Sequence, residues 1–126
     1  MRNLAAALVL GSFALVLAAC GGGGNGQAQS LADATTKAVY NDDPQGVTSH
    51  FDDQLKSQVT RTEVGILSDQ MHKQGDYQGL SFMNSDPNKN EYTYRANFSK
   101  GSMNVVVRLD QNGEIAAYRV LASASQ

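Results

Sequence analysis

The sequence predicts an α+β domain in which helices come first and an antiparallel sheet follows. Two observations support this prediction: apolar residues recur at helical spacing as far as Gly75, and they alternate with polar residues after it. Residues typical of turns separate the alternating segments. Because only the helical half can cover the apolar face of the sheet, we expect helices packed on a curved four-stranded antiparallel meander.

The N-terminal residues have the features of an export signal. A positive charge at Arg2 is followed by an apolar run from Leu4 to Val16, which is too short to span a membrane as a helix. The run ends at Leu17-Ala18-Ala19-Cys20, and the chain has a single cysteine. We therefore expect residues 1–19 to be a signal peptide.

Residues 20–30 are expected to form an anchor and a tether. Gly21 to Ser30 consists almost entirely of Gly, Asn, Gln, Ala and Ser, a composition typical of a flexible coil. The rest of the chain, residues 31–122, suits one small domain. With no second cysteine for a disulfide, its stability must come from packing.

The first two helices are predicted from their spacing and their caps. One begins at Leu31, with Ser30 as its N-cap. A second begins at Pro44, which suits the first helical position, with Asp43 as its N-cap. The same residues end the helix before it.

Two further caps are predicted before Gly75. Asp52-Asp53 offers an N-cap, and Thr60 with Glu63 fits a capping box. Behind this box an apolar stripe ends at Gly75, in C-cap position; its members are Val64, Leu67 and Met71. Ile66 falls outside the stripe, so we expect it to be half exposed or to contact a second surface.

Four strands are predicted after Gly75. They span Tyr77 to Met83, Tyr92 to Phe98, Met103 to Leu109, and about Glu114 to Leu121. The alternation assigns the inward face of the second and third strands to Tyr92, Tyr94, Ala96, Phe98, Met103, Val105, Val107 and Leu109.

The order of elements and several turns resemble a known superfamily. The segments Phe51-Asp52-Asp53-x-Leu55, Gly75-Asp76-Tyr77 and Asn112-Gly113-Glu114-Ile115 are similar to those of uncharacterised bacterial secreted domains in the nuclear transport factor 2-like superfamily, also called cystatin-like. The resemblance covers most of residues 31–122 and implies a cone, with helices in the concave face of the sheet. Members include isomerases, dehydratases and dimerisation modules, so the fold leaves the function open.

The segment Leu17-Ala18-Ala19-Cys20 resembles the lipobox of bacterial lipoproteins. The resemblance implies that Cys20 is diacylated, becomes the mature N-terminus and tethers the protein to a membrane of the cell envelope. In Gram-negative lipoproteins an Asp after the cysteine resembles an inner-membrane retention signal, so Gly21 favours the outer membrane if the source has one. The rival interpretation, a free thiol, would risk misplaced disulfides in an oxidising compartment.

Composition and spacing argue against several other functions. A net charge of −2 argues against nucleic acid as a partner. His50 and His72 have no third ligand at metal-binding spacing, so we expect neither a metal nor another cofactor. The loop from Asn84 to Asn90 lacks the central Gly of a calcium loop. The pairs Asp42-Asp43 and Asp52-Asp53 suit helix caps better than paired catalytic acids.

The candidate ligand-binding residues are Tyr92, Tyr94 and Phe98, because aromatic rings supply apolar area and phenols supply hydrogen bonds. No serine lies in a nucleophile elbow, and no acid occupies an inward strand position, so no catalytic residue is assigned. We expect a non-catalytic module that binds a small apolar ligand, an envelope protein or a second copy of itself. The alternative, drawn from the superfamily resemblance, is an isomerase- or hydratase-like enzyme with Tyr92 or Tyr94 as hydrogen-bond donor.

Overall fold

The computed structural model describes the backbone of residues 23–123 and the side chains of residues 26–123. The predicted signal peptide and Cys20 lie outside the described residues. Four helices precede four strands, which confirms the α+β class. The elements are α2 (Gly23–Tyr40), α3 (Pro44–Thr48), α4 (Asp53–Lys56), α5 (Arg61–Lys73), β2 (Tyr77–Asp86), β3 (Glu91–Phe98), β4 (Ser102–Leu109) and β5 (Ile115–Ala122).

The first described helix begins earlier than the sequence predicted. α2 starts at Gly23, so the predicted start at Leu31 with Ser30 as N-cap is wrong, and the helix replaces most of the predicted coil. Ala28 and Ala32, four residues apart, are both fully buried. Burial of this small-residue stripe outweighs the weak helix propensity of the glycines around it.

The predicted caps of the later helices are confirmed. Asp43 caps α3 and Asp52 caps α4, each accepting a backbone N–H three residues on. At α5 the Thr60 hydroxyl accepts the N–H of Glu63 at 3.1 Å, and the Glu63 carboxylate accepts the N–H of Thr60 at 3.3 Å. Gly75 follows the end of α5 with φ of 101°, a left-handed conformation that favours glycine.

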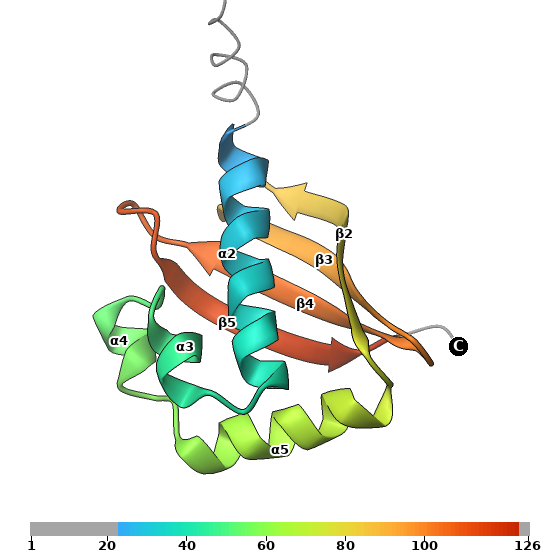
Figure 1. Ribbon diagram of the computed structural model, residues 1–126. Coiled ribbons are helices and arrows are strands. Elements are labelled where there is room, and N and C mark those ends of the chain that lie inside the picture. The colour runs from blue at the N-terminus through green and yellow to red at the C-terminus, as the bar shows by residue number, and fades with distance from the viewer. Residues whose placement is uncertain (1–22, 124–126) are drawn as a thin grey trace, which may run out of the picture.

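The strands form one open antiparallel sheet in the order β2-β3-β4-β5, which confirms the predicted meander. Tyr94 lies opposite Val105, and Val105 lies opposite Val120. β2 runs to Asp86, beyond the predicted end at Met83, and its pairing with β3 is interrupted by two register shifts. β2 and β5 are the two edge strands (Figure 1).

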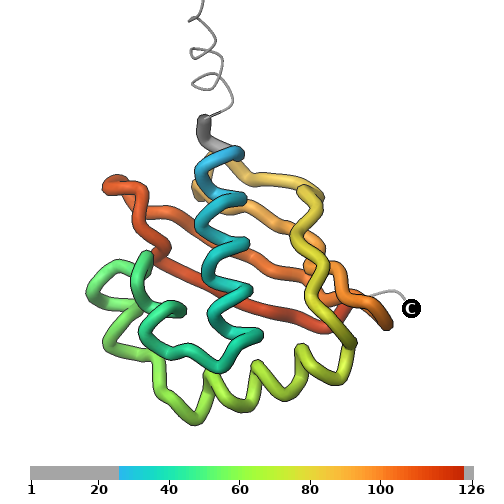
Figure 2. The backbone as a smooth tube through the Cα atoms, viewed as in Figure 1, coloured from blue at the N-terminus to red at the C-terminus, as the bar shows by residue number. Residues whose placement is uncertain are grey.

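The core lies between α2 and one face of the sheet, which we call the inner face. Figure 2 shows α2 crossing this face, with α3, α4 and α5 gathered around its C-terminal half. The residues predicted to point inward on β3 and β4 are buried, apart from the partly buried Tyr92. Val106, on the opposite outer face, is only 8% exposed and is therefore also buried.

Candidate functional site

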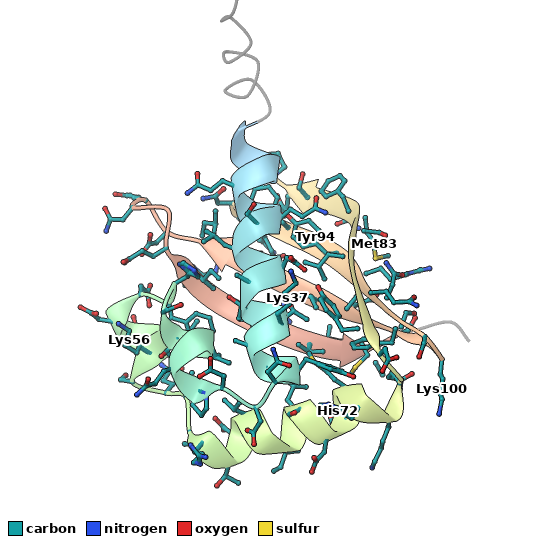
Figure 3. All side chains as sticks on the ribbon, viewed as in Figure 1. Lys37, Lys56, His72, Met83, Tyr94 and Lys100 are labelled. Carbon is teal, nitrogen blue, oxygen red and sulfur yellow. The ribbon has the colours of Figure 1, made fainter. Side chains whose placement is uncertain are left out.

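The aromatic residues selected from the sequence belong mainly to the core. Tyr94 is fully buried and is drawn beside α2 in Figure 3, and Phe98 is 5% exposed. The Phe98 ring lies 5.6 Å from that of Tyr77, centroid to centroid. Tyr92 is nearer the surface, where its hydroxyl donates to Asn90 Oδ1 at 3.2 Å. The three residues line neither of the two openings described below.

The first opening is a cavity of about 290 Å³ between the helices and β5, which we call the helical cavity. Its polar rim carries the exposed side chains of Gln58 and Glu63, and Tyr118 of β5 forms part of its wall. The apolar wall comes from all four described helices and includes Val39, Val47, Leu55, Val64 and Leu67.

The position of this cavity follows from how the short helices attach to β5. The Ile115 carbonyl accepts the N–H of Asp52 at 2.9 Å, and the Ile115 N–H donates to the carbonyl of His50 at 2.8 Å. These bonds make Phe51 a parallel bridge partner of Ile115. The link holds the α3–α4 connection beside the start of β5, and the helical cavity lies between the helices and this strand.

Tyr118 presents a neutral phenol to the helical cavity. Its hydroxyl lies 2.7 Å from the hydroxyl of Thr36, which is fully buried on α2. Burial raises the pKa of Tyr118 well above its ordinary value, although the bond with Thr36 lowers it in part. Sequence reasoning did not select this residue. The alternation of Tyr118 with Arg119 along the last predicted strand was the sequence signal that could have identified it as an inward residue.

The second opening is a groove of about 550 Å³ along the free edge of β5, which we call the edge groove. Its floor comes from residues 116–119, and α4 contributes Gln54 and Leu55. Two arginines, Arg108 and Arg119, and two carboxylates, Asp52 and Asp110, line it. Leu55 and Tyr118 line both openings, so the edge groove adjoins the helical cavity.

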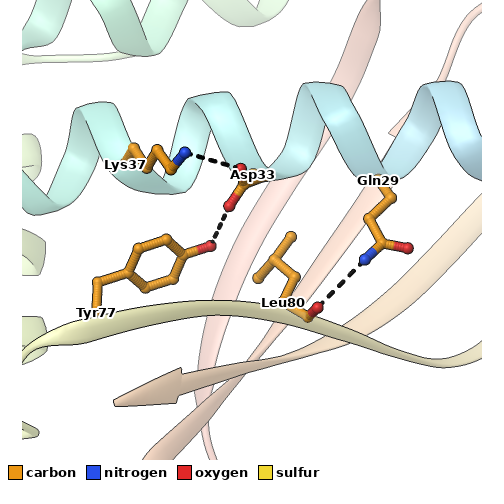
Figure 4. A network of polar contacts seen from close by, with 5 residues as sticks. All are labelled: Gln29, Asp33, Lys37, Tyr77 and Leu80. Atoms are coloured by element: carbon orange, nitrogen blue, oxygen red, sulfur yellow. Dashed lines mark hydrogen bonds and ion pairs between the residues drawn. The ribbon is translucent and has the colours of Figure 1, made fainter. Parts of the chain in front are cut away.

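A separate polar network joins α2 to β2 (Figure 4). The Tyr77 hydroxyl donates to Asp33 Oδ1 at 2.6 Å, and Lys37 Nζ lies 3.2 Å from Asp33 Oδ2. Burial, and then the bonded Asp33 carboxylate, raises the pKa of Tyr77. On the same helix face Gln29 Nε2 donates to the carbonyl of Leu80 at 3.2 Å. This network fixes α2 against the sheet edge.

The two histidines lie apart and in different environments. His72 Nδ1 is 2.9 Å from the carbonyl of Ser68, and its ring stacks on Tyr40 with centroids 4.0 Å apart. His50 is exposed near the end of α3. Within residues 26–123 no three His, Cys, Asp or Glu side chains are grouped so as to hold a metal ion.

Among the described helices, none is both long enough and apolar enough to cross a membrane. In comparisons with protein-family models, curated proteins and solved structures, no match to this chain is found.

Proposed function

We propose that this chain is a lipid-anchored, non-catalytic binding domain of the cell envelope, with a nuclear transport factor 2-like fold. The anchor is Cys20, on the strength of its lipobox-like context. In this proposal the helical cavity receives the apolar part of a ligand. The observation that carries the proposal is the cavity itself, with its apolar wall, polar rim and single wall phenol at Tyr118. Such a lining is typical of sites that bind small molecules.

The size of the helical cavity limits what it accepts. Its volume of about 290 Å³ is at the lower end of ligand pockets. A compact apolar molecule fits such a space better than a large polycyclic one. Gln58 and Glu63 at the rim would contact the polar end of a bound molecule.

The polar groups of the cavity favour binding over catalysis. Tyr118 is already paired with Thr36, and Glu63 accepts the N–H of Thr60 in the capping box. Acid–base catalysis needs a group placed within reach of the reacting proton and matched to it in pKa. A phenol with a raised pKa and an exposed capping carboxylate suit that role poorly.

The proposal is tested with an apolar fluorescent probe, N-phenylnaphthylamine, and the chain from Gly21 onward, which carries no lipid. We expect saturable binding that Leu67→Trp abolishes, because the indole would fill the cavity. Ile66→Trp is the matched control, since Ile66 is on the same helix and 55% exposed. Equal probe binding by the two variants would show that the cavity is not the site.

A further inference from the structure

The two edges of the sheet are protected very differently. On β2, two register shifts break the regular edge, and Gln29 of α2 occupies the carbonyl of Leu80. Bulges and covering elements of this kind prevent a sheet edge from pairing with another chain. On β5 the register with β4 is regular from Ala117 to Ala122. In the described part of the chain, the backbone bonds from β5 to segments outside the sheet are those of Ile115 with His50 and Asp52, so the strand beyond Ile115 keeps an open edge.

Hydrogen bonds at both ends of the β3–β4 pair show which backbone groups of β4 face β3 and which face β5. The Phe98 N–H donates to the carbonyl of Gly101 at 2.9 Å, and the Leu109 N–H donates to that of Asn90 at 3.1 Å. The odd-numbered residues of β4 therefore pair with β3, and the even-numbered ones pair with β5.

This alternation identifies the open backbone groups of β5. Val106 pairs with Arg119, so the N–H and C=O of Arg119 face β4. Those of Tyr118 and Val120 face outward, and Tyr118 also lines the edge groove. Their side chains point to the inner face, as do their cross-strand partners Val107 and Val105.

A strand added beside β5 would contact different kinds of side chain on its two faces. Residues directly opposite one another in a sheet project on the same side. Side chains opposite Tyr118 or Val120 would point toward the helical cavity, which shares Tyr118 with the edge groove. A side chain opposite Arg119 would lie on the outer face, beside the guanidinium.

The outer face near Arg119 is positively charged. Across β3, β4 and β5 it carries Arg95, Arg108 and Arg119, with one carboxylate, Glu91. Glu91 lies 3.6 Å from Arg119, and no ion-pair partner of Arg95 or Arg108 is found in the described part of the chain. Both carboxylates at the groove are engaged with backbone N–H groups: Asp52 caps α4, and Asp110 accepts from Asn112 and Glu114.

We propose that β5 binds an extended segment of a partner protein as a fifth strand, and that this segment alternates apolar and acidic residues. Its backbone bonds to Tyr118 and Val120, an apolar side chain enters the helical cavity, and an acidic one pairs with Arg119. The inference rests on the proposed binding function and identifies the ligand as a protein segment.

The test uses the full lipidated chain in detergent micelles and synthetic peptides that alternate valine with glutamate. The control peptides carry lysine in place of glutamate. We expect saturable binding of the glutamate peptides, about tenfold tighter than that of the lysine peptides, and slowed amide exchange at Tyr118 and Val120. Equal affinity for both sets would overturn the proposal.

Two variants examine the backbone and the charge separately. Val120→Pro removes an outward N–H without breaking the β4 ladder, and we expect about tenfold weaker binding than in Val120→Ala, which keeps that N–H. If the proline variant fails to fold, Arg119→Glu decides, because it should reverse the preference toward lysine peptides. An unchanged preference in that variant contradicts the proposal.

Two further outcomes separate this inference from the proposed function. If the chain self-associates through β5, so that Val120→Pro converts a dimer to a monomer, the edge serves a second copy and the inference is wrong. If the probe binds in a Leu67→Trp-sensitive way while no peptide binds, the inference fails but the proposed function stands. Loss of both kinds of binding removes the proposed function as well.

Discussion

The hydroxyl of Thr36 on α2 lies 2.7 Å from the hydroxyl of Tyr118 on β5, joining residues 82 positions apart in the chain. The bond connects the central helix to an open sheet edge. Because the Tyr118 ring forms part of the wall of both the helical cavity and the edge groove, its orientation shapes both. A single, partly buried hydrogen bond thus links the stability of the core to the geometry of the candidate site.

The first prediction concerns the energy of this bond. Thr36→Val keeps the side-chain shape but leaves the Tyr118 hydroxyl without its partner, so the free energy of unfolding should fall by about 1–3 kcal/mol. Tyr118→Phe removes the other hydroxyl and should also destabilise. Urea unfolding of both single variants and the double variant measures the coupling, which we expect at about 0.5–1.5 kcal/mol. Strictly additive losses would show that the two hydroxyls do not interact.

The second prediction is a loss of stability in alkali. The folded-state pKa of Tyr118 lies above its unfolded value near 10.0 because of burial, so above that pH the unfolded chain releases the phenolic proton before the folded chain does. Stability from this group is complete below pH 10 and falls as pH rises toward the folded pKa. Each such phenol contributes a slope of up to about 1.4 kcal/mol per pH unit.

Unfolding curves of the parent chain and of Tyr118→Phe between neutral pH and strong alkali measure this slope. The variant should lose stability less steeply, since it lacks one of the buried phenols. Tyr92→Phe is the control, because Tyr92 is nearer the surface and its hydroxyl bond to Asn90 is exposed. Identical slopes for the parent chain and Tyr118→Phe would contradict the prediction.

Local signals predicted most of the fold. Asp43, Asp52 and the Thr60–Glu63 pair mark helix starts because a cap depends on neighbouring residues alone. The alternation through β3 and β4 likewise gave the correct inward face. The start of α2 was missed because its glycines disfavour a helix locally, while burial of Ala28 and Ala32 stabilises it through tertiary contacts.

The candidate site depends on contacts that local patterns do not contain. The helical cavity exists because the ends of several helices leave a space beside Tyr118, and no single segment encodes that space. The aromatic stripe through Tyr94 and Phe98 was visible in the sequence, yet α2 covers it. The open edge of β5 depends on strand order and on the Phe51–Ile115 bridge, which are also non-local.

The third prediction compares neighbouring valines on the two faces of β4. Val107 is fully buried in the core, so Val107→Asp places an unpaired charge there and should unfold the domain. Val106 is 8% exposed on the outer face, directly opposite Arg119. Val106→Asp should therefore destabilise measurably but leave a folded chain, since Arg119 can pair with the new carboxylate.

Circular dichroism and thermal melting distinguish the two variants. Val106→Asp combined with Arg119→Ala should be less stable than the sum of the single changes predicts, because the carboxylate then loses its pairing partner. If Val106→Asp unfolds the chain as completely as Val107→Asp does, the outer face is as intolerant of charge as the core.

The last prediction tests the anchor at Cys20. Several acyl chains on one cysteine would hold the protein on a membrane, since each buried methylene contributes about 0.8 kcal/mol and a single chain binds only marginally. Cys20→Ser removes the thiol and should prevent lipidation, leaving the chain uncleaved or soluble. Membrane fractionation with mass analysis of the N-terminus measures both outcomes, and Gly22→Ser, two residues beyond Cys20, should remain lipidated. A Cys20→Ser chain of mature size that still sediments with membranes would show that Cys20 is not the anchor.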